Sequence, residues 1–235
     1  IQAQEIINAI FPIKLGEKFR QLAQKGLGRD VDLEAGMFLI MEFGYPNSDP
    51  QSCREDLDLL ARQLEQNLAL DADPTQIVVT LTQLLFQQEN FKGNQNNFMD
   101  PDNSYLNKVL EHKTGLPITL SALCVLVASR LDLPIVGIGL PGHYIAKYNL
   151  PQGGIYFDPF HQGRTLTRAD CIKISEQFGQ PFEEHFLSQS THRETLVRMM
   201  NNLVQVYQSS NELKKAETLS SYIKILLNPE NTRGH

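Results

Sequence analysis

The stretch ITLSALCVLVASRL, residues 118–131, contains no charged residue before Arg130 and carries apolar side chains on every face of a helix. A helix that is apolar all round is buried on all sides, because none of its faces prefers water. Pro117 precedes the run, in the first helical turn, where a proline is well tolerated. The stretch therefore predicts a central helix around which the rest of a domain packs.

Three strand-like segments follow this helix, at residues 133–140, 143–148 and 155–157. The sequence Pro-Gln-Gly-Gly at residues 151–154 is a turn signal that would make the second and third segments antiparallel neighbours. Another helix is expected to begin near Thr167, with Asp170 supporting its cap. The order of these elements predicts an α+β fold with a central buried helix.

Helical patterns flank this centre on both sides. The first 90 residues read as helices joined by short loops, with start signals at Asp49-Pro50 and Asp73-Pro74. Residues 193–227 read as two antiparallel helices of tetratricopeptide type, and a single pair is too short for a solenoid. We therefore expect a packing appendage rather than a peptide-binding groove there. The predicted parts are an N-terminal helical region (1–90), an α+β core (91–190) and a helical pair (191–235), packed as one compact unit.

Composition and charge exclude several classes of protein. A formal net charge of −6 over 235 residues argues against nucleic acid or a membrane surface as partner, since both favour a basic face. No apolar run is long enough to span a membrane, and residues 1–11 lack the features of a signal peptide. The sequence starts without Met, so a leader removed before Ile1 stays open. The scattered Cys53, Cys124 and Cys171 are typical of reduced thiols, which predicts a cytoplasmic location.

Four motifs occur in order along the middle of the chain: NSYLNKVL (103–110), TGLPITL (114–120), GLPGHY (139–144) and FDPF (157–160). Together they resemble the SirB-type branch of the transglutaminase-like superfamily. The resemblance extends over about residues 30–230 and includes the helical pair that commonly follows the core. It implies a papain-like core, in which a central buried helix packs against an antiparallel sheet. In active relatives a Cys lies at the start of this helix, a His at the start of one strand and an Asp on the next strand.

His143 and Asp158 match the second and third of these positions, and local sequence supports both. Leu140-Pro141-Gly142 has proline and glycine where a type II turn requires them, which would place His143 at the start of its strand. Asp158 precedes Pro159 and is therefore held extended. A buried His–Asp hydrogen bond that only holds a hairpin is the alternative. The flanking motif favours a remnant of a catalytic pair, in which the carboxylate fixes the imidazole tautomer.

The nucleophile is where the sequence departs from active relatives. Counting back from the turn that closes the central helix, the cysteine position is occupied by Pro117, which has neither a thiol nor an N–H group. The neighbours Leu116 and Ile118 are equally inert. Cys124 lies about two turns further along a helix that is apolar on every face, so we expect it to be a core thiol. Thr119 has no predicted base beside it.

No cofactor or metal site is predicted. The histidines lack paired metal-ligand spacing, and neither a P-loop nor a dinucleotide-binding motif is present. His161 follows Asp158 by three residues and would approach His143, which leaves an adventitious ion as a minor alternative. The Asn-rich segment 91–97 reads as low-complexity loop, with a structured loop beside a site as the weaker alternative.

The resulting hypothesis is a catalytically inactive papain-like fold that binds a protein or peptide. Its groove would lie beside the central helix, with candidate residues Tyr105, Asn107, Pro117, His143 and Asp158. The first alternative is a hydrolase or acyl transferase that uses His143 and Asp158 with Cys124 or an activated water. The second is a scaffold that depends on the C-terminal helical pair. Neither nucleic acid nor a membrane is expected as partner.

Overall fold

The computed structural model describes the backbone of residues 2–228 and the side chains from residue 10 onward. Within that range the chain forms two compact units. One combines residues up to 48 with residues 99–101 and those from 191 onward, and the other holds residues 49–98 and 102–190. The division at residues 90 and 190 stays a prediction.

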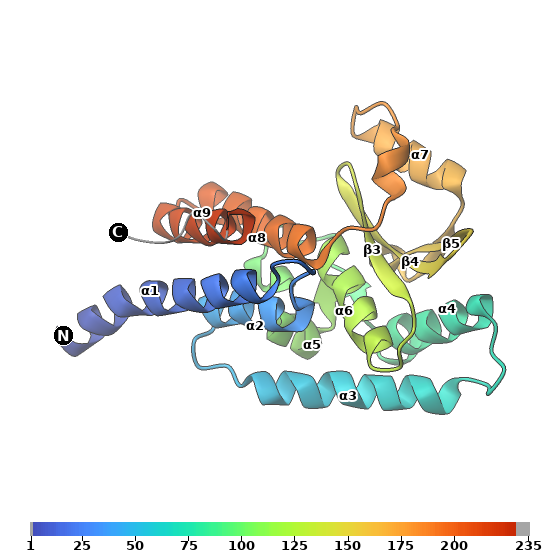
Figure 1. The fold of residues 1–235 in the computed structure, drawn as a ribbon, viewed down its shortest axis with the longest axis horizontal. Coiled ribbons are helices and arrows are strands. Elements are labelled where there is room, and N and C mark those ends of the chain that lie inside the picture. The colour runs from blue at the N-terminus through green and yellow to red at the C-terminus, as the bar shows by residue number, and fades with distance from the viewer. Residues whose placement is uncertain (1, 229–235) are drawn as a thin grey trace. The chain divides into compact units, whose positions relative to one another are not determined.

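The larger unit is built on a four-stranded antiparallel sheet in the order β3-β4-β5-β6 (Figure 1). Its strands are β3 (Ile135–Leu140), β4 (His143–Leu150), β5 (Gly153–Asp158) and β6 (Arg164–Leu166). Each strand pairs with the next along the chain, and the β3–β4 turn is tight because Leu140 faces His143 directly. β3, β4 and β5 follow the three predicted segments, whereas β6 was not predicted. The sheet confirms the α+β class.

Helix α6 (Pro117–Ser129) is the predicted central helix. Every residue from Pro117 to Ala128 is buried, as expected for a helix without a polar face. It packs on β3 and β4, and α3 (Pro50–Asn67) contacts it as well. Pro117 occupies the first helical position, where its missing N–H leaves no hydrogen bond unmade.

Short elements surround this centre and position the loops of the candidate site. β1 (Lys92–Gly93) pairs in parallel with β2 (Thr114–Gly115), directly before α6. The predicted caps at Asp73 and Thr167 are present, each in a capping box. The remaining elements are α4 (Pro74–Gln83), a π-helical turn η1 (Leu84–Gln88), the 3-10 turns η2 (Pro101–Ser104), η3 (Pro159–His161) and η4 (Glu184–Leu187), α5 (Leu106–His112) and α7 (Arg168–Gln177).

The smaller unit consists of helices from both ends of the described chain: α1 (Gln2–Lys25), α2 (Leu33–Gly44), α8 (His192–Ser209) and α9 (Leu213–Leu227). α8 and α9 form the predicted helical pair, and α1 and α2 pack against it. The rings of Phe19 and Tyr222 stack with centroids 4.8 Å apart. Asp30 accepts hydrogen bonds from the backbone N–H groups of His192 and Arg193 at the start of α8.

No helix within the described range is both long and apolar enough to cross a membrane.

Gly36→Ala should lower the free energy of unfolding by about 1–3 kcal/mol, because the added Cβ would lie 2.2 Å from the Leu196 side chain. Urea denaturation measures this change. Without that contact, alanine in a helix interior should instead stabilise the chain by about 1 kcal/mol. Combining Gly36→Ala with Leu196→Ala should therefore cost less than the sum of the two single changes. Additive losses would contradict the packing of α2 on α8.

Candidate functional site

The start of the central helix lies beside the start of β4. The Ser121 hydroxyl donates a hydrogen bond to the Tyr144 carbonyl oxygen, at 3.5 Å, in the buried contact between α6 and β4. Pro117 lies one helical turn before Ser121 on the same face of α6, and His143 directly precedes Tyr144. This contact brings the position that a nucleophile would occupy to the strand that begins with the histidine.

The turn before His143 has the expected geometry. Gly142 has a φ angle of 67°, which the third position of a type II turn requires. A side chain here would also collide with the ring of Phe178, because a Cβ atom at Gly142 would lie 2.1 Å from it. Glycine is therefore needed both for the backbone conformation and for the close approach of Phe178. The result is a fixed starting direction for β4 and its first residue, His143.

Asp158 joins two histidines through one carboxylate oxygen. Its Oδ2 lies 2.8 Å from His143 Nε2 and 2.8 Å from His161 Nδ1. Its Oδ1 accepts hydrogen bonds from the backbone N–H groups of Phe160, at 3.0 Å, and His161, at 3.3 Å. The Asp158 side chain is 1% exposed, His143 is 10% exposed and His161 is 50% exposed. The carboxylate is thus buried with both of its oxygens occupied.

These hydrogen bonds set the charge of the carboxylate and the tautomer of the first histidine. Burial alone would raise the pKa of Asp158, but the hydrogen bonds from His143 and His161 outweigh it and hold that pKa below its ordinary value. An ionised carboxylate accepts a proton-bearing nitrogen, so His143 carries its hydrogen on Nε2 when it is neutral. Nδ1 is then the basic nitrogen of the ring. In the Ser-His-Asp arrangement the carboxylate binds Nδ1 instead, so the His143 ring has the opposite orientation with the same division of roles between its two nitrogens.

No cysteine lies at the start of α6. Cys124 is fully buried in α6, and burial raises the pKa of its thiol well above the ordinary value. Burial also raises the pKa of Cys171 to about 11, and Cys53 is buried in α3. A thiolate is the reactive form of cysteine, so each of these environments suppresses reactivity. The Thr119 hydroxyl is buried and has no hydrogen-bond partner among the described residues.

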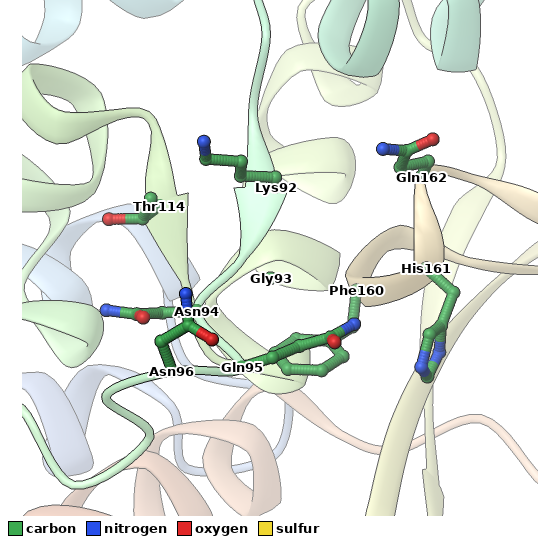
Figure 2. A pocket seen from close by; sticks show the side chains of 9 residues that line it. All are labelled: Lys92, Gly93, Asn94, Gln95, Asn96, Thr114, Phe160, His161 and Gln162. Atoms are coloured by element: carbon green, nitrogen blue, oxygen red, sulfur yellow. The ribbon is translucent and has the colours of Figure 1, made fainter.

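A pocket of about 470 Å³ lies next to His161. Figure 2 shows its wall built from the Asn-rich loop and from the turn that follows Asp158. The lining residues are Lys92, Gly93, Asn94, Gln95, Asn96, Thr114, Phe160, His161 and Gln162. Tyr105 and Pro117, which the sequence placed in a groove, are buried and are not among these lining residues, and neither is the partly buried Asn107.

The Asn-rich loop is a structured loop. Asn94 donates to the Asn103 side-chain oxygen at 2.9 Å, and Asn103 donates in turn to the Asn97 carbonyl oxygen at 2.8 Å. The backbone N–H of Asn97 closes this network on the Asn94 side-chain oxygen at 3.1 Å. Gly93 allows the ring of Phe160 to pack against the loop, since a Cβ atom there would lie 2.4 Å from the ring. Of the two sequence interpretations, the weaker one, a structured loop, agrees with this network. That the loop lies beside a functional site stays a prediction.

Sequence reasoning missed Thr114 and Gln162 as lining residues, and it included Lys92 only as part of segment 91–97. The available signal was indirect: an amide-rich loop of low helical and strand propensity, and a short polar stretch directly after the FDPF motif. The parallel pairing of β1 with β2 and the contact between β1 and η3 bring these segments together. His161 belongs to both features, because it lines the pocket and binds Asp158.

Asp158→Ala should lower the free energy of unfolding by about 2–3 kcal/mol, because it leaves two backbone N–H groups and two imidazoles without their acceptor. Chemical denaturation measures the loss. Asp170→Ala is the matched control, since Asp170 caps an exposed helix end and should cost about 1 kcal/mol. Equal losses of unfolding free energy in the two variants would contradict the inference that Asp158 stabilises the fold by accepting four hydrogen bonds.

Comparison with known proteins places this geometry in a family. The chain is 34% identical to a UPF0162 protein of Xylella fastidiosa strain 9a5c over 148 residues, which are 59% of this chain and 52% of that protein. It is 28% identical to a UPF0162 protein of Pseudomonas aeruginosa over 182 residues, 76% of this chain and 66% of that protein. Mouse F-box only protein 21 is 28% identical over 140 residues, 56% of this chain and 22% of that protein.

The chain spans about half the length of the Xylella proteins it matches. No solved structure matches it. The family model described as the transglutaminase-like superfamily matches residues 51–201, more than half of the chain, and this range contains α6, the sheet, His143 and Asp158. On this match and on the arrangement of its central helix and sheet, the chain belongs to the transglutaminase-like superfamily.

Proposed function

We propose that this chain is a catalytically inactive member of the SirB-type branch, and that it binds a protein or peptide segment in the pocket beside His161. The observation that carries the proposal is Pro117 at the first position of α6, a helix that packs on the strand beginning with His143, which is hydrogen-bonded to Asp158. We also propose that α8 and α9 form a tetratricopeptide-like pair and that the protein is cytoplasmic. The three cysteines are scattered along the sequence and buried, which supports a reducing compartment.

The case for inactivity rests on the chemistry of the first helical turn. A cysteine at a helix N-terminus is activated because the helix dipole and the unpaired N–H groups stabilise its thiolate. Proline at the same place supplies no nucleophile and removes one of those N–H groups. Cys124 does not replace the missing thiol, since it is fully buried and its pKa is raised. The His143–Asp158 pair is therefore left without a partner to activate among the cysteines.

The case for binding rests on the lining of the pocket. Side-chain amides come from the loop at Asn94–Asn96 and from Gln162 on the opposite wall (Figure 2). Amides both donate and accept hydrogen bonds, which suits the backbone of an extended peptide. Lys92 is exposed and has no acidic partner among the described residues, and the lining contains no acid. The pocket thus favours a peptide segment that carries a carboxylate.

A hydrolase that activates water through His143 and Asp158 is the second candidate function, and the 2.8 Å hydrogen bond between the two side chains favours it. Peptide hydrolysis and amine incorporation are the assays that separate the two functions. The proposal expects no turnover by the purified chain in either assay. Turnover that is lost in His143→Ala would replace the proposal with this second function.

Pro117→Cys should create a thiol that iodoacetamide alkylates roughly tenfold faster at neutral pH than Cys124 of the same helix. Both positions are buried in α6, but only position 117 lies at the helix N-terminus, which lowers a thiol pKa by about one unit or more. Mass spectrometry of the labelled site measures the rate. Cys124 is the reference, because it is buried in the same helix. Pro117→Ala reports any loss of folding that follows from removing the proline. Alkylation at the reference rate would contradict the assignment of Pro117 to the nucleophile position.

Lys92→Glu should weaken binding of peptides selected from a displayed random library by about tenfold or more, because a charge-assisted hydrogen bond contributes about 1.5–3 kcal/mol. Fluorescence polarisation with a labelled selected peptide measures the affinity. Lys173→Glu is the matched control, since Lys173 is exposed on α7 and does not line the pocket. If both changes weaken binding equally, or neither does, the pocket is not the binding site.

A further inference from the structure

Three side chains that can bind a metal ion converge beside the pocket. They are His143 at the start of β4, Asp158 at the end of β5 and His161 in η3. Their ligand atoms, His143 Nε2, Asp158 Oδ2 and His161 Nδ1, lie within 4.8 Å of one another. We propose that these three residues bind one divalent transition-metal ion, of which Zn²⁺ is the representative. The site goes beyond peptide binding and does not depend on it.

The donor set matches the ion. Imidazole nitrogen and carboxylate oxygen are common ligands of zinc, at about 2.0–2.2 Å from the metal. At those distances, ligand atoms in a tetrahedron lie about 3.3 Å apart. The carboxylate oxygen is 2.8 Å from each nitrogen, so each imidazole has to move away from it by about half an ångström to admit the ion. The two nitrogens, which lie within 4.8 Å of each other, also have to reach the tetrahedral separation. The half-exposed His161 ring has room to make that movement. Each nitrogen gives up the hydrogen that it donates to the carboxylate, and this hydrogen moves to the other ring nitrogen or is released as a proton.

The carboxylate is already oriented for this role. Its Oδ1 is held by the backbone N–H groups of Phe160 and His161, which turns Oδ2 toward both rings. Hydrogen bonds to the second oxygen of a ligating carboxylate are a regular feature of protein metal sites, because they fix the ligand before the ion arrives. Proline at position 159 restricts the backbone between these groups. The site is therefore built on fixed backbone rather than on a mobile loop.

Three protein ligands leave coordination positions open. A zinc ion with three protein ligands binds water or another molecule in its remaining position. His161 also lines the pocket, so a ligand in the pocket would lie beside the ion. In the alternative, the same contacts are only a hydrogen-bond network that holds β4, β5 and η3 together. A metal site and a purely structural hydrogen-bond network predict different results when metal is added, since only the first binds the ion.

Equilibrium dialysis of the untagged full chain against ZnCl₂, without any peptide, tests the proposal. One ion per chain should bind, and His161→Ala should weaken binding by at least about tenfold, since even the loss of an outer-shell partner of a metal site costs about 10–100-fold. His161 is half-exposed, so this variant should keep its fold, which circular dichroism checks. Co²⁺ should give the strong visible absorption of a four- or five-coordinate ion in the unchanged chain, and His161→Ala should remove it.

His185→Ala is the matched control, because His185 Nδ1 lies 3.1 Å from Glu183 Oε2 on an exposed surface outside the cluster. This variant should bind metal as the unchanged chain does. The proposal is overturned if no ion binds, if His161→Ala binds as tightly as the unchanged chain, or if His185→Ala loses as much affinity. Repeating the peptide titration with a chelator present separates the two proposals. If no metal binds, the peptide-binding proposal is unaffected, and if no peptide binds, the metal-binding proposal is unaffected.

Discussion

The buried carboxylate of Asp158 is the contact on which the site depends. It accepts hydrogen bonds from two backbone N–H groups and two imidazoles, and these four donors belong to β4 and to the turn after β5. A buried carboxylate without such donors would be strongly unfavourable. Its presence therefore requires that His143, Phe160 and His161 keep their places. The turn at Gly142 and the packing of α6 on β4 hold the other side of this arrangement.

Features set by local pattern were predictable from the sequence. The central helix followed from an apolar run without a polar face, and the start of β4 followed from proline and glycine before His143. The pairing of His143 with Asp158 was implied by the family resemblance and supported by the turn between their strands, and the two side chains do meet. Each of these inferences used residues close in sequence or a strong periodicity. That is where sequence reasoning has physical support.

Features set by distant contacts were not predictable in the same way. The smaller unit joins the two ends of the described chain, and no local pattern connects Asp30 with His192. The same holds for the pocket, whose walls are brought together by contacts such as that of β1 with η3. Tyr105 was expected in a groove beside the central helix, but tertiary packing leaves it 1% exposed. His161 was noted only as a neighbour, although it shares the carboxylate oxygen with His143.

Phe160 belongs to the pocket and to the carboxylate network at once. Its ring packs against Gly93 in the pocket wall, and its backbone N–H binds Asp158 Oδ1. A molecule in the pocket that moves the Phe160 backbone would also move this amide away from the carboxylate. Through this one residue, occupancy of the pocket and binding at the two imidazoles would be thermodynamically linked, and such linkage is reciprocal. A ligand at the imidazoles would then change the affinity in the pocket by the same factor with which an occupant of the pocket changes the affinity at the imidazoles.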